Sequence, residues 1–165
     1  MTLARHEAEE LLYREALLLD RGEWDAWLSL YLPDCEFWMP AWRDETCPTE
    51  DPDRELSLIY YRGRRSLEDR VWRARSGLSV ASTPRPRVVH AVTNVLVIST
   101  SGADEAEVSA SFTVHLRDVR AERSHVFFGR YEHDLRRCDG EWRIAAKKIL
   151  LLNDVIPTVV DFYCV

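Results

Sequence analysis

Glycine is scarce in this chain of 165 residues, which contains only 6 glycines. Neither a G-x-G-x-x-G pattern nor a G-x-x-x-x-G-K-[ST] loop occurs, and both phosphate-binding patterns need glycines at fixed spacing. Cysteine is also sparse, with only 4 in the chain: Cys35, Cys47, Cys138 and Cys164. No two of them form a C-x-x-C pair. The sequence therefore argues against a nucleotide-binding loop and predicts no disulfide framework.

Long apolar runs and an excess of positive charge are missing as well. No segment approaches the roughly 20 apolar residues of a membrane-spanning helix, and residues 1–20 lack the features of a secretory signal. The formal net charge is −6 at pH 7, whereas nucleic-acid binding depends on clustered Lys and Arg. The basic run at residues 62–65 is followed by Glu68 and Asp69, which is typical of a solvated or partner-facing loop. We therefore expect a cytoplasmic protein that binds neither membranes nor nucleic acids.

The five histidines show no ligand spacing for iron. They are His6, His90, His115, His125 and His133, and no two of them form an H-x-x-x-H or H-x-x-x-x-H pair. A mononuclear iron centre needs two His and a carboxylate on one face, and a Rieske cluster needs two Cys and two His. No cysteine lies one or two residues from a histidine, so we expect no metal site and no bound cofactor in this chain.

The first part of the chain has helical periodicity. Apolar residues follow helical spacing to about residue 20, with Glu15 as an interruption, and a second amphipathic stretch ends at Pro33. A third stretch with the same spacing occupies residues 66–78. We therefore expect helices within residues 1–33 and over residues 66–78.

The second part alternates polar and apolar residues. Four alternating segments separated by turn signals occur within residues 88–153, and they predict long antiparallel strands with one buried face. The acidic, proline-bearing residues 43–55 are typical of a long surface loop. A chain of this length fits a single domain, 1–165. Helices packed on one face of a strongly curved antiparallel sheet define an α+β fold, which resembles the cystatin-like roll of ketosteroid isomerase and scytalone dehydratase.

Candidate catalytic residues are few. General acid or base chemistry in the hollow of such a roll needs a carboxylate or a His that projects into it. His90 and Asn94 lie four residues apart on a predicted strand, so they would share a face. A His on a strand is more often a hydrogen-bonded structural residue, so we interpret both as structural polar residues and assign no catalytic residue. Two alternatives stay open: a stand-alone isomerase or dehydratase that uses His90 or Asp34, and a small-molecule binding module.

Four separated segments resemble the small (β) subunit of aromatic-ring-hydroxylating dioxygenases, most closely those that act on benzoate, anthranilate or 2-halobenzoate. The segments are YREALLLDRGEWDAWLSLYLPDCEFWMPAW, EDPDRELSLIYY, SLEDRVWR and RVVHAVTNV. They span about the first 95 residues in the family's order and spacing. The basic run at residues 62–65 departs from the family's pattern.

The resemblance implies a structural subunit without a cofactor of its own. In this family the β subunit adopts the cystatin-like roll and packs with other β subunits, as a trimer, against the catalytic α subunits of an α3β3 oxygenase. The α subunit carries the Rieske [2Fe-2S] cluster, the mononuclear Fe(II) and the active site, and a reductase delivers electrons from NADH. The complex adds both atoms of O2 to the aromatic ring.

The resemblance also favours a surface role for the aromatic segment YLPDCEFWMPAW, which by itself fits either a ligand pocket or a contact with another chain. Aromatic side chains anchor obligate interfaces, and arginines pair with carboxylates across them. The predicted interface residues are Trp38, Met39, Trp42, Tyr60, Tyr61, Arg64, Arg65 and Arg70. The competing interpretation of single members, such as Trp38 and Tyr60, is that they are ordinary core residues.

Overall fold

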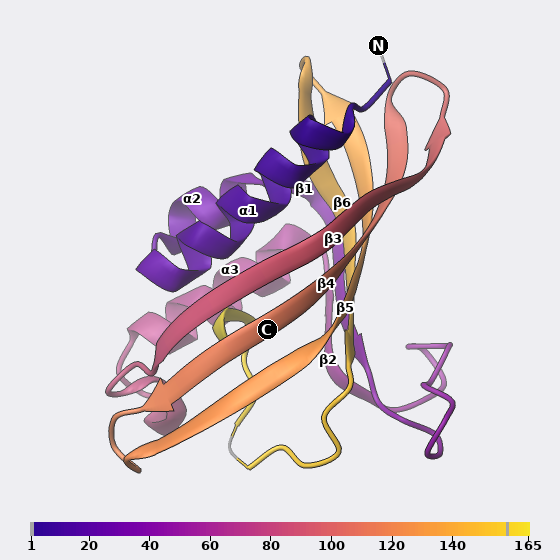
Figure 1. Cartoon of the computed structure of the whole chain (residues 1–165). Coiled ribbons are helices and arrows are strands. Elements are labelled where there is room, and N and C mark those ends of the chain that lie inside the picture. The colour runs from indigo at the N-terminus through magenta and orange to yellow at the C-terminus, as the bar shows by residue number, and fades with distance from the viewer. Residues whose placement is uncertain (1, 158) are drawn as a thin grey trace.

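The computed structural model describes residues 2–157 and 159–165 and has an α+β architecture, with helices packed on one face of a twisted sheet (Figure 1). The helices are α1 (Arg5–Arg21), α2 (Trp24–Ser29) and α3 (Arg64–Arg75), with short 3-10 turns η1 (Val80–Ser82) and η2 (Phe162–Cys164). The strands are β1 (Tyr31–Pro40), β2 (Ser57–Arg62), β3 (Arg87–Ser101), β4 (Glu105–Asp118), β5 (Arg123–Cys138) and β6 (Glu141–Leu151). The predicted fold class is confirmed.

The six strands form one open sheet in the order β2-β1-β6-β5-β4-β3. Strands β3 to β6 form consecutive antiparallel hairpins, and β1 pairs with β6 in the parallel direction. The alternation of β4 divides the two faces cleanly, because Val108, Phe112 and Val114 are buried while His115 and Arg117 on the other face are exposed. One face of the sheet therefore holds the core.

Helix α1 lies across the inner face of the sheet and buries one apolar stripe there. Its buried residues are Ala8, Leu11, Leu12, Glu15, Ala16 and Leu19. The helix ends at Arg21, and the next residue, Gly22, has a φ of 71°, the left-handed conformation that glycine adopts without a Cβ clash. The second helix ends at Ser29, earlier than the predicted limit of residue 33, because the chain enters β1 at Tyr31 and Pro33 lies inside that strand. Pro33 stands where the β1–β6 pairing is interrupted, between Tyr31 and Glu36.

The segment between β1 and β2 contains the predicted surface loop at residues 43–55. Its carboxylate anchor is Glu55, which accepts the backbone N–H groups of Glu50 at 2.7 Å and Asp51 at 2.9 Å, and the guanidinium of Arg43. These hydrogen bonds, first those from the backbone, lower the pKa of the Glu55 carboxyl to about 2. The loop is thus organised by its own polar groups.

The C-terminal segment folds back between the helices and the sheet (Figure 1). Phe162, Tyr163, Cys164 and Val165 are all buried. Phe162 stacks on Trp27 with ring centroids 5.1 Å apart, and Arg70 of α3 holds Asp161 in a two-pronged ion pair. The end of the chain therefore fills part of the space that a curved sheet and its helices enclose.

Candidate functional site

The interior of the roll contains a buried charge cluster that is centred on Glu15 of α1. Lys147 Nζ on β6 lies 2.9 Å from Glu15 Oε1, and His133 Nε2 on β5 lies 3.4 Å from Glu15 Oε2. The Tyr31 hydroxyl donates a hydrogen bond to the same carboxylate, and Trp27 Nε1 lies 3.4 Å from it. Each of the three ionisable side chains is at most 2% exposed. We call Glu15, His133 and Lys147 the interior triad.

The register of the sheet explains why these side chains meet. His133 and Lys147 are direct partners across the β5–β6 ladder and face inward, so that both reach the helix that crosses above them. The ammonium group of Lys147 also lies 4.1 Å from the centre of the Tyr131 ring, whose negative face attracts a cation. Two strands and one helix therefore converge on one carboxylate.

The electrostatics favour an ionised Glu15 beside a neutral His133. Burial alone would raise the pKa of Glu15, but the Lys147 ammonium, the His133 ring and the Tyr31 hydroxyl outweigh it and hold that pKa well below its usual range. Burial lowers the pKa of His133, against the opposing pull of Glu15. Burial also lowers the pKa of Lys147, and its pairing with Glu15 offsets part of that effect.

The interior triad has the residue types of an acid-base centre but no room for a substrate. Aromatic side chains, among them Trp27, Phe37 and Tyr131, pack around it with almost no exposed surface. The main hollows formed by residues 2–157 and 159–165 lie at the surface and are lined by other residues. A general acid or base must reach the reacting group within hydrogen-bond distance, so this geometry favours a structural role for the triad.

His90 is a structural anchor between β3 and α1. Its Nδ1 lies 2.6 Å from Asp20 Oδ1, and its backbone N–H points to the same carboxylate. The expectation that His90 and Asn94 share a face is wrong, because the ladder is interrupted between Thr93 and Leu96 and Asn94 has a φ of 54°. This bulge inverts the alternation, so His90 is buried while Asn94 is exposed and lies 3.4 Å from Ser111 Oγ.

Asp34, the other residue that the isomerase alternative would use, lies outside the interior. Its side chain is 67% exposed and pairs with Arg136 at 3.1 Å. The hydrogen bond from Arg136 lowers the pKa of the Asp34 carboxyl, which keeps it ionised. Neither His90 nor Asp34 therefore lies beside a cavity suited to catalysis.

The predicted aromatic interface residues make contacts within the chain. Trp38 donates a hydrogen bond from Nε1 to Ser57 at 2.9 Å, and Trp42 donates to the Leu151 carbonyl at 2.8 Å. Met39 is 0% exposed and packs in the chain's own core, so it offers a partner no contact area. Met39 is buried because its side chain points to the inner face of the sheet. The sequence alone does not show which face of β1 a given side chain points to.

Two tyrosines of the predicted interface set lie on β2. Tyr60 donates a hydrogen bond to Glu36 at 3.2 Å and is only partly buried. Tyr61 packs near Phe37, with ring centroids 6.3 Å apart.

The three predicted interface arginines differ in the contacts that they make within the chain. Arg64 bonds the Tyr31 carbonyl at 3.2 Å, Arg70 holds Asp161, and Arg65 is exposed. For the set as a whole, apart from Met39, contact with another subunit stays a prediction.

Sequence reasoning missed the interior triad. The signals were present, since Glu15 interrupts an apolar helix stripe and Lys147 occupies the inward phase of a strand between Ile144 and Ile149. A charged residue in a buried phase needs a partner, but Glu15 and Lys147 are 132 positions apart and periodicity does not pair them. Over the described part of the chain, the structure contains no group of three His, Cys, Asp or Glu side chains placed to hold a metal ion, and no helix long and apolar enough to cross a membrane.

The fold defines a class, the cystatin-like α+β proteins. A crystal structure of a putative scytalone dehydratase from Novosphingobium aromaticivorans DSM 12444 superposes with a TM-score of 0.68, covering 93% of this chain and 88% of that one. Its sequence is only 15% identical to this chain, so this likeness concerns the fold alone.

Sequence comparison then identifies the family. The model for the ring hydroxylating beta subunit matches residues 14–158. The 2-halobenzoate 1,2-dioxygenase small subunit of Burkholderia cepacia is 41% identical over 152 residues, which are 92% of this chain and 90% of that relative. The β subunit of benzoate 1,2-dioxygenase from Burkholderia mallei ATCC 23344 is 32% identical, with a TM-score of 0.82 and coverage of 100% and 99%. This chain belongs to the ring-hydroxylating β-subunit family, which confirms the resemblance.

Proposed function

We propose that this chain is the non-catalytic, structural β subunit of a multi-component dioxygenase that hydroxylates a benzoate-like aromatic carboxylate. Its similarity to subunits named for 2-halobenzoate and benzoate dioxygenases supports both the reaction type and the substrate class. In this proposal the α subunit carries the Rieske [2Fe-2S] cluster, the mononuclear Fe(II) and the active site, and a reductase delivers electrons from NADH. The β chains stabilise an α3β3 oxygenase in the cytoplasm.

The closed interior is the observation that carries the non-catalytic role. Glu15, His133 and Lys147 could move protons if a substrate reached them, but each is at most 2% exposed. The C-terminal Phe162 stacks on Trp27, whose Nε1 lies 3.4 Å from Glu15. An acid-base cluster that the chain's own core seals in this way supports the fold of a subunit, not a reaction.

Expression of the chain alone and together with its α subunit tests this proposal. We expect the chain alone to contain no stoichiometric iron and to consume no O2 with benzoate-like carboxylates and NADH. We expect the co-expressed chains to purify as one complex that contains iron and, with its reductase, forms a cis-diol or the catechol derived from it. Conversion of an aromatic carboxylate by the chain alone, or its failure to bind the α subunit, would overturn the proposal.

A further inference from the structure

One end of the roll holds a hollow of about 320 Å³ on the inner side of the sheet. Three segments that are distant in sequence line it, and they meet at the lower end of the molecule in Figure 1. They are the linker between α3 and β3, the end of β4 with the turn that follows, and the C-terminal segment. Neither the interior triad nor His90 or Asp34 lines this hollow. It is therefore separate from the groups described above.

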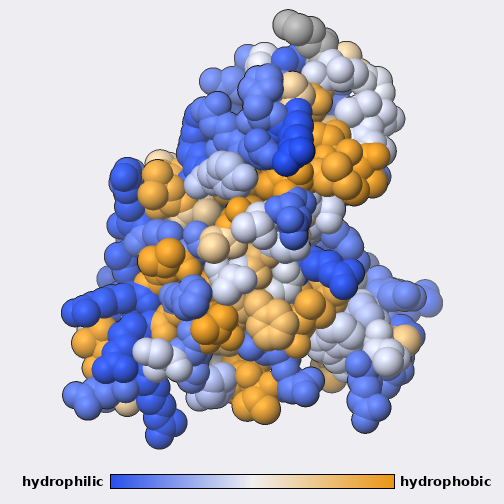
Figure 2. Space-filling view, viewed as in Figure 1, coloured by the Kyte–Doolittle hydropathy of each residue, from blue (hydrophilic) through white to orange (hydrophobic). Residues whose placement is uncertain are grey.

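The lining of this hollow is mainly apolar. Leu116 and Tyr163 are at most 2% exposed and form its floor, whereas Val80 and Val159 are 72% and 56% exposed and stand at its rim. In the space-filling view, hydrophobic side chains reach the surface in several patches between charged ones (Figure 2). Small-molecule sites are hollows of this size with apolar walls and a few polar groups. The hollow therefore has the walls of a small-molecule site.

The linker side of the hollow is held in place by Arg85. The central carbon of its guanidinium group lies 5.5 Å from the centre of the Trp24 ring. The group also packs against Gly22, where a Cβ atom would come within 1.6 Å of Arg85 Nη1. Pro84 and Pro86 flank Arg85 and line the hollow, and the ring of a proline fixes its φ angle. This wall is therefore formed before any ligand binds.

The C-terminal side of the hollow is fixed to the linker and to α3. The hydroxyl groups of Tyr163 and Ser82 share a hydrogen bond of 2.9 Å, and Asp161 binds Arg70. A preformed site binds a ligand without the entropic cost of ordering its walls. Both walls are therefore ready for a ligand.

A positively charged side chain stands at the rim. Arg120 is the only cation among the lining residues, and over the described part of the chain its guanidinium group forms no ion pair or hydrogen bond. Asp118 fixes this turn, because its Oδ1 accepts the backbone N–H groups of Arg120 and Ala121, each at 3.0 Å. A guanidinium group forms charge-assisted, often two-pronged hydrogen bonds with a carboxylate. The hollow therefore fits an apolar molecule that carries a carboxylate.

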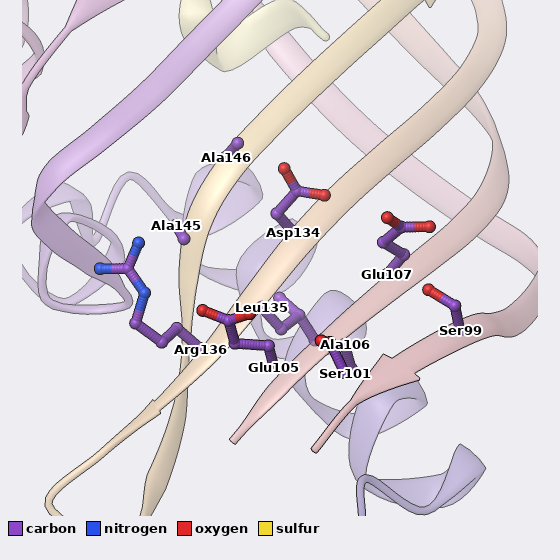
Figure 3. A pocket seen from close by; sticks show the side chains of 10 residues that line it. All are labelled: Ser99, Ser101, Glu105, Ala106, Glu107, Asp134, Leu135, Arg136, Ala145 and Ala146. Carbon is purple, nitrogen blue, oxygen red and sulfur yellow. The ribbon is translucent and has the colours of Figure 1, made fainter. Parts of the chain in front are cut away.

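A second hollow, on the outer face of the sheet, has the opposite charge. Glu107 and Asp134 line it, and their carboxylates lie on neighbouring strands (Figure 3). Arg136 also lines it but is paired with Asp34 at 3.1 Å. Like charges repel each other. The carboxylate of a ligand is therefore repelled in that hollow and attracted at Arg120.

We propose that the hollow at Arg120 binds an aromatic carboxylate, with the ring between the apolar walls and the carboxylate on the guanidinium group. A volume of about 320 Å³ is at the small end of the range for ligand sites and suits a single substituted ring. The inference rests on the proposed function in its choice of ligand, because such acids are the proposed substrates. This chain thus binds the acid apart from the active site that the proposed function assigns to the α subunit.

Methyl NMR of the full-length chain, labelled at Val and Leu, tests the site with benzoate as the probe. We expect saturable shifts of the Val80 and Val159 methyl signals. Arg120→Gln should weaken binding at least about tenfold, because it removes hydrogen bonds to a charged group. Acetate, which has the charge without the ring, and benzyl alcohol, which has the ring without the charge, should each bind at least about tenfold more weakly than benzoate.

The matched control is Arg87→Gln, which removes the same charge at an exposed position outside this hollow. It should bind benzoate like the unaltered chain, and circular dichroism checks that both variants are folded. Absence of saturable binding, equal binding by Arg120→Gln, loss of binding in Arg87→Gln, or acetate binding as tight as that of benzoate would overturn the inference. Iron content and ring hydroxylation by the complex with the α subunit report separately on the proposed function, since they do not depend on this hollow.

Discussion

Glu15 and Lys147 form an ion pair from which water is almost completely excluded. Taking two charges out of water costs several kcal/mol each, and their attraction repays this only when further hydrogen bonds complete the site. The Tyr31 hydroxyl donates such a hydrogen bond to Glu15. His133 Nε2 lies 3.4 Å from the other carboxylate oxygen, and the Tyr131 ring attracts the Lys147 ammonium group through its negative face. Removal of one partner should therefore destabilise the fold strongly. Removal of both partners together shows how much of that loss of stability depends on the pairing.

Single and double substitutions separate these two effects. Lys147→Met leaves the Glu15 carboxylate buried without its cation and should lower the free energy of unfolding by roughly 3–5 kcal/mol. Glu15→Leu should cost a similar amount for the corresponding reason. The double variant should cost clearly less than the sum, as urea unfolding of the isolated chain would show. Additive losses would mean that the two side chains do not depend on each other.

His133 should make stability depend on pH. Burial lowers its pKa in the folded chain, whereas the unfolded chain takes up a proton as the pH falls through about 6.5. The unfolded state then binds more protons, so the free energy of unfolding should decrease as the pH falls from 7 towards the folded-state pKa. The slope from this group is at most about 1.4 kcal/mol per pH unit.

The comparison variant for this pH effect is His133→Gln, which keeps a polar side chain without a titrating ring. Its free energy of unfolding should change less with pH than that of the unaltered chain between pH 5 and 7, roughly the range in which an ordinary His titrates. Identical slopes for both proteins would show that His133 does not titrate differently on unfolding.

Among the elements, β3 carries an irregularity that decides which side chains face inward. Asn94 at the bulge has a φ of 54°, a conformation that Asn tolerates and that a β-branched residue does not. Asn94→Val should therefore lower the free energy of unfolding by about 1–3 kcal/mol. Asn94→Gly, which fits the same backbone, should leave it nearly unchanged. Equal losses for both variants would mean that the hydrogen bond to Ser111, rather than the backbone, is what matters.

An ion pair with helix α3 helps to hold the C-terminal segment in place. Asp161 binds Arg70 of α3 and also accepts the backbone N–H of Phe162 at 2.8 Å. Asp161→Ala should free the segment, expose Trp27 beneath Phe162 and cost roughly 1–3 kcal/mol of unfolding free energy. Faster cleavage by a carboxypeptidase and a red-shifted Trp emission would report the release. Asp154→Ala, at an exposed position, is the control.

For the molecule as a whole, local patterns predicted the elements well and their long-range contacts poorly. Strands β3 to β6 lie within residues 87–151, where the alternation of polar and apolar residues predicted strands within residues 88–153. The parallel pairing of β1 with β6 joins residues more than a hundred positions apart, and no local pattern specifies it. The bulge at Asn94 inverted the predicted face of that residue for the same reason, since its register is set by β4.

In the candidate site, too, local features could be predicted from the sequence and long-range contacts could not. The absence of metal-ligand spacing was readable from the sequence, whereas the interior triad forms only when α1, β5 and β6 converge. The aromatic segment at residues 31–42 was recognised as important, but its phase on β1 turns Met39 inward and Trp38 towards Lys148, whose Nζ lies 5.4 Å from the centre of its indole ring. Periodicity marks a side chain as apolar and leaves open which surface it meets.

The most direct test of the account is the turnover number of the assembled oxygenase when the interior triad is removed. With Glu15→Leu and Lys147→Met in the chain, we expect fewer assembled complexes but a kcat per assembled complex within about twofold of the original, because the triad stabilises the subunit and touches no substrate. Removal of a general acid or base costs on the order of 10²–10⁴ in rate. A loss of that size in fully assembled, iron-loaded complexes would contradict the structural role of this chain.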